Sequence, residues 1–158
     1  MNRAVTAATA SAGIPGVQAP HEIAEAPGMP VSLVRQLIAS DPAWLTRLVD
    51  VYKINVTRDV GLVSLKYNQI ESPMHEPIVQ ECRGMVVNET TGKILAHPYN
   101  KFWNHGEPLA APIAWESARV LEKLDGSLMI LYYDDDAWRV ASSGTPKAGG
   151  TFGTQTTE

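Results

Sequence analysis

The sequence predicts an α+β fold, in which an antiparallel sheet follows a short helical N-terminal preface. Two observations lead to this prediction. Helix signals are concentrated in residues 31–54, and from there onward segments rich in Val, Ile, Leu and Tyr alternate with turn residues, as short hairpin-linked strands do. The length of 158 residues fits one domain, and a hydrophobic content of 44% is ordinary for a globular protein.

The first 28 residues differ in composition from the remainder of the chain. They are rich in Ala, Gly, Pro, Ser and Thr and show no hydrophobic periodicity. Such a segment cannot bury enough apolar surface to offset its ordering entropy. We therefore expect residues 1–28 to be a disordered leader and residues 29–158 to form the structured part.

Two short helices are predicted in residues 31–40 and 41–54. Asp41 is a favourable N-cap for the second helix, and Pro42 suits the first helical position. Apolar residues at i, i+3, i+4 and i+7 predict one stripe that faces a core. These residues are Leu45, Leu48, Val49 and Tyr52.

The sheet is predicted from four segments rich in β-branched, aliphatic and aromatic residues. They span residues 56–68, 84–99, 119–124 and 127–143. Residues 88–92 and 134–136 are predicted to be hairpin turns. The tail after residue 143 is rich in Gly and Thr, so we expect the sheet to be incomplete at the C-terminal side.

Charge and cysteine content limit the classes of protein that fit. A net charge of −4 is unlike the broad basic face of a protein that grips many phosphates, so any nucleic-acid contact should be local. Cys82 is the single cysteine, which excludes an internal disulfide and favours a reducing compartment. No apolar run reaches the roughly 18 residues that span a bilayer, and we expect a cytoplasmic protein without membrane contact.

The segment Lys123-Leu-Asp-Gly-Ser is the main candidate for chemistry. Its Asp125-Gly126 pair, between two apolar runs, is also a strong hairpin signal by itself. Three upstream segments favour the chemical interpretation. They are Lys66-Tyr-Asn, Glu81-Cys-Arg-Gly-Met-Val-Val and Pro98-Tyr-Asn-Lys-Phe-Trp-Asn.

Together, and in this order, these segments resemble the adenylyltransferase domain of the T4 RNA ligase 1-like family, part of the nucleotidyltransferase superfamily. The resemblance covers residues 54–150 and implies an ATP-grasp-like ligase sheet, here a partial domain. It implies Lys123 as the catalytic nucleophile that takes up AMP, with ATP and Mg²⁺ as cofactors and no protein residue assigned to the metal. It also implies four ATP-binding residues: Tyr67, Arg83, Lys101 and Gly126. The partners would be the 5′-phosphate and 3′-hydroxyl ends of RNA.

A lysine nucleophile needs a local source of positive charge. A lysine side chain in water has a pKa of about 10.4, so the neutral amine costs roughly 4.6 kcal/mol at pH 7. Nearby cations favour the neutral form of an amine, and Arg83, Lys101 or a metal on ATP could supply this charge.

Each candidate also has a purely structural interpretation. Arg83 could be a surface ion-pair residue, Lys101 a solvated loop lysine, and Tyr67 part of the core. Phe102 and Trp103 are expected to pack rather than stack on adenine. The acidic run 134–136 is expected to be a solvated turn, and the histidines lack metal-ligand spacing with Cys82.

The chain departs from the family at two places. The family's later acidic and Lys-x-Lys motifs have no counterpart before Glu158, so we expect residues 1–158 alone not to seal RNA. Where the family has a Lys or Arg before a Gly, this chain has Ser143 before Gly144, with Lys147 the nearby cation. A DNA ligase or capping-type nucleotidyltransferase, and a non-catalytic remnant that binds nucleotides or RNA ends, remain as alternatives.

Overall fold

A computed structural model of the chain describes residues 31–123 and 126–148, and it confirms the α+β fold with antiparallel sheets and a helical N-terminal preface. The predicted leader and the end of the tail lie outside the described residues. The elements in chain order are α1 (Leu33–Ser40), α2 (Trp44–Asp50), β1 (Ile54–Asp59), β2 (Leu62–Tyr67), α3 (Pro77–Glu81), β3 (Arg83–Asn88), β4 (Ile94–Ala96), β5 (Met129–Asp134) and β6 (Ala137–Ser142).

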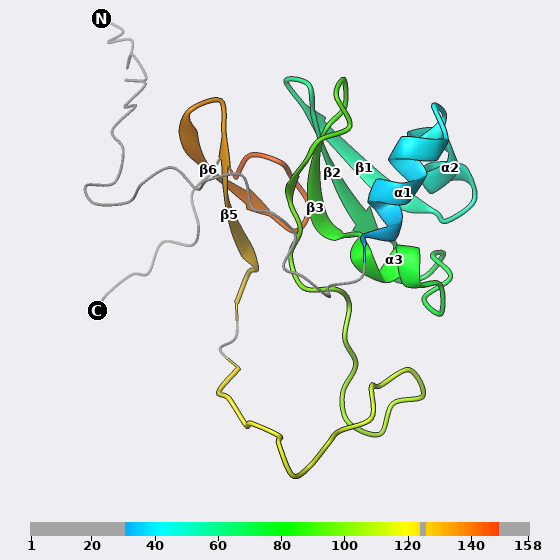
Figure 1. Ribbon diagram of the computed structural model, residues 1–158, viewed down its shortest axis with the longest axis vertical. Helices are drawn as coiled ribbons and strands as arrows, with labels where there is room; N and C mark the ends of the chain where they lie inside the picture. Colours follow the sequence, from blue (N-terminus) through cyan, green and yellow to red (C-terminus); the bar gives the residue numbers. More distant parts are fainter. Residues whose placement is uncertain (1–30, 124–125, 149–158) are drawn as a thin grey trace, which may run out of the picture.

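The elements form three layers (Figure 1). The central layer is an antiparallel sheet in the order β1-β2-β3-β4. The three helices cover one of its faces, and the β5–β6 hairpin packs on the other face. The described core therefore lies on both sides of one small sheet.

Alternation along the central strands explains why both faces are covered. In β2, Val63 and Leu65 point into the larger cluster beneath the helices, whereas Leu62 belongs to the cluster beneath the hairpin. In β3, Val86 belongs to the hairpin side and Val87 to the helix side. Because successive side chains of a strand face opposite ways, the near-continuous apolar runs of β2 and β3 require two covering layers.

The start of α2 corrects the predicted cap. The helix begins at Trp44, after a turn at residues 42–43, so Pro42 is outside it. Asp41 instead stabilises the turn: its Oδ1 accepts a hydrogen bond from the amide of Ala43 at 2.8 Å. The buried face of the helix is correspondingly rotated, because Trp44 and Leu48 are buried while Val49 is 41% exposed.

Both predicted hairpin turns are confirmed. The side chain of Asn88 accepts hydrogen bonds from the amides of Thr90 and Thr91, at 3.1 and 2.9 Å, which closes the turn between β3 and β4. Asp135 and Asp136 join β5 to β6 with φ values of 50° and 55°, the backbone of a tight two-residue hairpin turn.

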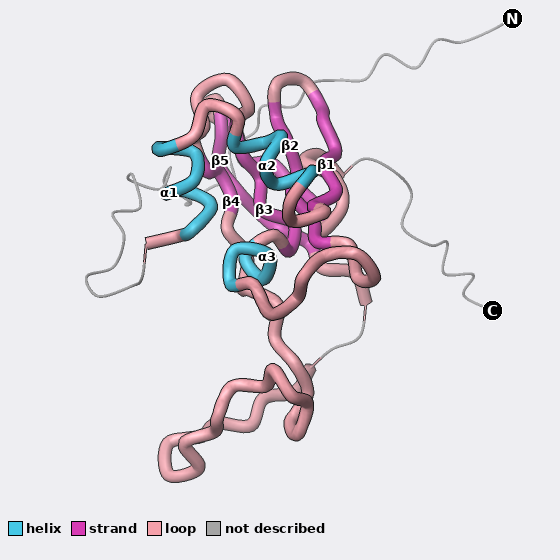
Figure 2. Tube along the Cα trace, turned by 90° about the vertical axis from the view of Figure 1, so that its right-hand side faces the viewer, coloured by secondary structure: helices cyan, strands magenta, loops and turns pink. Residues whose placement is uncertain are grey.

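Two elements differ from the sequence prediction. Residues 119–123 form no strand; they end a long loop that begins at residue 97 and projects below the layers (Figure 2). The helix α3 was not predicted, because its five residues are too few to show a helical repeat.

Glu81, at the end of α3, ties the helical layer to the sheet. Its carboxylate is 6% exposed and accepts three hydrogen bonds from the start of α1. The donors are the Ser32 hydroxyl at 2.6 Å and the amides of Leu33 and Val34 at 2.9 and 3.1 Å. A carboxylate at a helix N-terminus satisfies amides that have no partner within the helix and interacts favourably with the helix dipole.

We predict that Glu81→Ala lowers the free energy of unfolding by roughly 2–3 kcal/mol, because it leaves buried donors unsatisfied. Urea unfolding followed by circular dichroism would measure the change. Glu89→Ala is the matched control, since the Glu89 carboxylate pairs with Arg58 at the surface, where an ion pair contributes at most about 1 kcal/mol. Equal losses in the two variants would contradict this role of Glu81.

Candidate functional site

A cleft of about 540 Å³ lies where the ends of β2 and β6 meet the start of β3. This size is within the usual range of small-molecule sites. Among the described residues, its lining combines two cations and several hydroxyl groups and includes no carboxylate. The lining residues are Lys66, Tyr67, Gln69, Arg83, Gly126, Ser127, Leu128, Ser142, Ser143, Thr145 and Ala148.

Gly84 allows the two walls of the cleft to meet. Its φ of +98° lies in a region that L side chains rarely adopt, and a Cβ there would be 2.8 Å from the Cα of Ser143. The same Cβ would lie 3.1 Å from the Cδ1 of Ile130, in β5. The glycine of the Arg83-Gly84 pair is therefore required where the sheet and the hairpin approach each other.

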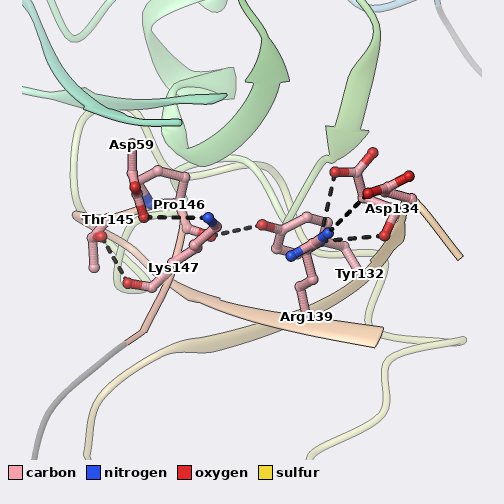
Figure 3. Close-up of polar contacts among 8 residues, drawn as sticks. Asp59, Tyr132, Asp134, Arg139, Thr145, Pro146 and Lys147 are labelled. Atoms are coloured by element: carbon pink, nitrogen blue, oxygen red, sulfur yellow. Dashed lines mark hydrogen bonds and ion pairs between the residues drawn. The ribbon is translucent and has the colours of Figure 1, made fainter. Parts of the chain in front are cut away.

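The β6 side of the cleft is held by contacts that Figure 3 shows. The hydroxyl of Tyr132 donates to the carbonyl of Pro146 at 2.8 Å, and burial raises the pKa of Tyr132. Lys147 pairs with Asp59 of β1 at 3.8 Å, and its carbonyl accepts from the Thr145 hydroxyl at 2.9 Å. Lys147 is thus paired with a carboxylate and does not line the cleft.

Three of the predicted ATP-binding residues come together in this cleft: Tyr67, Arg83 and Gly126. Tyr67 is 9% exposed and belongs to the larger core cluster. It therefore packs in the core and also lines the cleft. Arg83 forms no ion pair with any described residue; its guanidinium lies 4.8 Å from the centre of the Phe102 ring. A surface ion pair does not explain Arg83 within this part of the chain.

Lys101 lies outside the cleft, in the loop that follows β4. Its Nζ donates to the carbonyl of Phe102 at 2.8 Å and lies 5.2 Å from the centre of the Trp103 ring. Its amide donates to the carbonyl of Gln80, which attaches the loop to α3. The two aromatic rings beside Lys101 therefore contact cations, and Phe102 is largely exposed rather than packed in a core.

Lys123 is exposed and precedes the cleft by a few residues of chain. Residues 124–125 are not described, so this position is bounded by chain length. Three successive Cα–Cα steps join it to Gly126, which sets an upper limit of roughly 11 Å between the two Cα atoms. The long flexible stem of a lysine can cover part of this distance.

The hairpin interpretation of Asp125-Gly126 is not supported by the neighbouring described residues. Residues 119–123 form no strand, and β5 pairs with β6 instead. Asp125 itself lies outside the described residues.

Cys82 is structural. The thiol is buried, its Sγ lies 3.4 Å from the carbonyl of Ile78, and burial, with the neighbouring Glu81 charge second, raises its pKa well above the ordinary range. A thiol in this environment is a poor nucleophile and a poor metal ligand. Within residues 31–123 and 126–148, no group of three or more His, Cys, Asp or Glu side chains could hold a metal ion.

Sequence reasoning missed two residues of this region. Lys66 stands beside Tyr67 in the sequence and was assigned no role. Its side chain nevertheless lines the cleft near the end of β2. Glu81 was noted as part of a motif, and its role as a cap could not be found because its partners are 47 to 49 residues away. No helix in the described part of the chain is long and apolar enough to cross a membrane.

Comparison with known proteins agrees with the resemblance. Residues 81–157 match the model of an RNA ligase family of the T4 RNA ligase 1 type. Over these residues, which are just under half of the chain, the sequence is similar to the T4 RNA ligase 1-like family. No solved structure matches the chain.

Three curated relatives support this assignment. RNA ligase 1 of bacteriophage TS2126 is 40% identical over 74 residues, covering 42% of this chain and 19% of that protein. The RNA ligase of Rhodothermus phage RM378 is 30% identical over 95 residues, covering 45% and 22%. A protein of Autographa californica nuclear polyhedrosis virus, provisionally named as a bifunctional polynucleotide kinase/RNA ligase, is 28% identical over 125 residues, covering 71% and 18%. The chain thus spans about a fifth of the length of these relatives.

We predict that Gly84→Ala destabilises the protein much more than Gly61→Ala. Both glycines have positive φ, but a Cβ at Gly61 would meet nothing within 4 Å, whereas one at Gly84 would meet the backbone of Ser143. The difference between the two variants isolates the steric contact from the backbone strain, and we expect it to exceed about 1 kcal/mol in urea unfolding. Equal destabilisation would show that the hairpin does not press on β3 at this point.

Proposed function

We propose that this chain carries the nucleotide-binding and nucleophilic part of an ATP-dependent RNA ligase, with Lys123 as the residue that takes up AMP. The main support is the cleft itself. Tyr67, Arg83 and Gly126 come from segments far apart in the sequence and line one cavity with cations and hydroxyl groups. Gly126 follows Lys123 closely in the chain. Cations and hydroxyl or amide donors are the groups that bind phosphates.

In the proposed first step, the neutral amine of Lys123 attacks the α-phosphorus of ATP. A P–N bond forms, the bond from the α-phosphorus to the bridging oxygen breaks, and pyrophosphate leaves while the amine loses its proton to solvent. Arg83 would face the phosphates, where its charge offsets the charge that develops on the oxygens. Tyr67 and Gly126 would bound the nucleotide's site.

The later steps concern RNA. AMP would pass from Lys123 to the 5′-phosphate of an RNA end, which restores the lysine, and a 3′-hydroxyl would then attack that phosphate and release AMP. Mg²⁺ would neutralise oxyanion charge, and it would arrive on the nucleotide phosphates, since the described residues contain no cluster of acidic ligands. Because the relatives are about five times longer, sealing of strands by residues 1–158 alone is not expected.

The first test is covalent labelling. The protein is incubated with Mg²⁺ and α-labelled ATP, and we expect an acid-sensitive AMP adduct that peptide mapping assigns to Lys123. Lys123→Ala should abolish the adduct without loss of stability, because an exposed loop lysine contributes little packing. Lys93→Ala removes an exposed lysine from the β3–β4 turn and should leave labelling unchanged. An adduct that persists in Lys123→Ala, or that maps to Lys101, would contradict the assignment.

The second test concerns Arg83. Charge-assisted contacts contribute roughly 1.5–3 kcal/mol, so Arg83→Ala should slow adduct formation by about tenfold or more. Arg83→Lys should recover little of the rate, because an ammonium group can neither make a bidentate contact with phosphate nor stack on the Phe102 ring as a guanidinium does. Urea unfolding of each variant provides the control for folding. Equal rates in the three proteins would show that Arg83 does not contact the nucleotide.

A further inference from the structure

We propose that Lys66 is a second phosphate-binding residue of the cleft, and that with Arg83 it holds the polyphosphate of the nucleotide. The resemblance to the RNA ligase family assigns no role to Lys66. The inference rests on the proposed function in one respect, namely that the ligand is a nucleoside triphosphate.

The register of the sheet places the two cations side by side. Lys66 of β2 pairs with Arg83 of β3, next to a register shift between Leu65 and Lys66. Directly opposite residues of antiparallel strands point to the same face, with Cα atoms about 4.5–5.5 Å apart. Both side chains line the cleft.

Like charges in directly opposite positions destabilise a sheet unless something neutralises them. No carboxylate of the described residues pairs with either cation, and none of them lines the cleft. The guanidinium of Arg83 instead makes a cation–π contact with the face of the Phe102 ring. Two cations that share one cavity, and that no described carboxylate pairs with, are the groups expected at a site for a multiply charged anion.

The opposite wall of the cleft supports this role for Lys66. Ser143 lies there, at the position where the resembling family has a Lys or Arg, and Lys147 is engaged by Asp59 at 3.8 Å. Lys66 and Arg83 are the cations that line the same cavity as Ser143 among the described residues. We infer that the positive charge missing from the β6 side is supplied from β2.

Binding of inorganic pyrophosphate and of ATP, measured by isothermal titration calorimetry, tests the proposal without requiring catalysis. We expect Lys66→Ala to weaken both by about tenfold, whereas Lys93→Ala, which removes the same charge away from the cleft, should change neither. In the double variant Lys66→Ala/Ser143→Lys, a cation is restored on the opposite wall, and affinity should recover. Adenosine, which carries no phosphate, should be insensitive to all these changes.

Several results would overturn the proposal: no binding of pyrophosphate by the unaltered protein, equal effects of Lys66→Ala and Lys93→Ala, or no recovery in the double variant. A 5′-phosphorylated oligoribonucleotide and its 5′-hydroxyl counterpart form a further pair. If Lys66→Ala affected only the difference between these two RNAs, the site would hold an RNA end and not a nucleotide.

Repeating the titrations with Lys123→Ala separates this inference from the proposed function. Pyrophosphate binding that depends on Lys66, in a protein that forms no AMP adduct, would leave the anion site intact and contradict only the nucleophile.

Discussion

The close contact between Gly84 and Ser143 is the constraint on which the candidate site depends. Within the described residues, the two strand systems share no backbone hydrogen-bonded ladder. The β5–β6 hairpin is instead held to the sheet by side-chain packing, by this close approach and by the Lys147–Asp59 ion pair. A side chain at position 84 would meet the Cα of Ser143 at 2.8 Å and would separate the two walls. Because the interior of a protein is close-packed, such a separation would also expose the small cluster around Val86 and Ile130.

The same contact accounts for the electrostatic character of the cleft. With the hairpin packed on the sheet, Lys66 and Arg83 line one cleft together with residues 142–143 at the end of β6. Low-dielectric walls strengthen charge interactions and focus the field of the cations on whatever enters. In the proposed anion site, the contact at Gly84 therefore contributes to the field that the two neighbouring cations produce. This coupling gives a physical reason for an Arg-Gly pair, in which the charge and the missing side chain occupy adjacent positions.

Local signals in the sequence were enough to predict much of the fold. The hairpin turns at Asn88 and at residues 134–136, the strands around them and the two N-terminal helices all depend on interactions between residues close in the chain. The errors arose where long-range packing decided. Helix α2 begins at Trp44 and not at Pro42 as predicted, because the bulky apolar side chain of Trp44 packs in the core. Residues 119–123 had strand-like composition but no neighbouring strand with which to pair, and they remain part of a loop.

The candidate site was predictable only in part, for the same reason. The resemblance predicted one site with Tyr67, Arg83, Lys101 and Gly126. The structure brings all of these except Lys101 to one cleft. The close approach that forms the cleft could not be predicted from the sequence, because Ser143, the partner of Gly84, lies 59 residues later. Lys66 was overlooked since a lysine on a strand usually points to solvent. Its significance depends on the register that sets it beside Arg83.

Four successive residues, from Glu81 to Gly84, show how tightly function and stability are combined here. Glu81 caps α1, Cys82 fills the core under the helices, Arg83 lines the cleft, and Gly84 contacts the hairpin. The chain changes from helix to strand within this run, so consecutive side chains face different layers of the molecule. A substitution that disturbs the cap at Glu81 would shift the start of β3, and with it the guanidinium of Arg83. Measurements of anion binding at this cleft must therefore be read together with the stability of each variant, because the residues that hold the layers together adjoin the residues that are proposed to face the ligand.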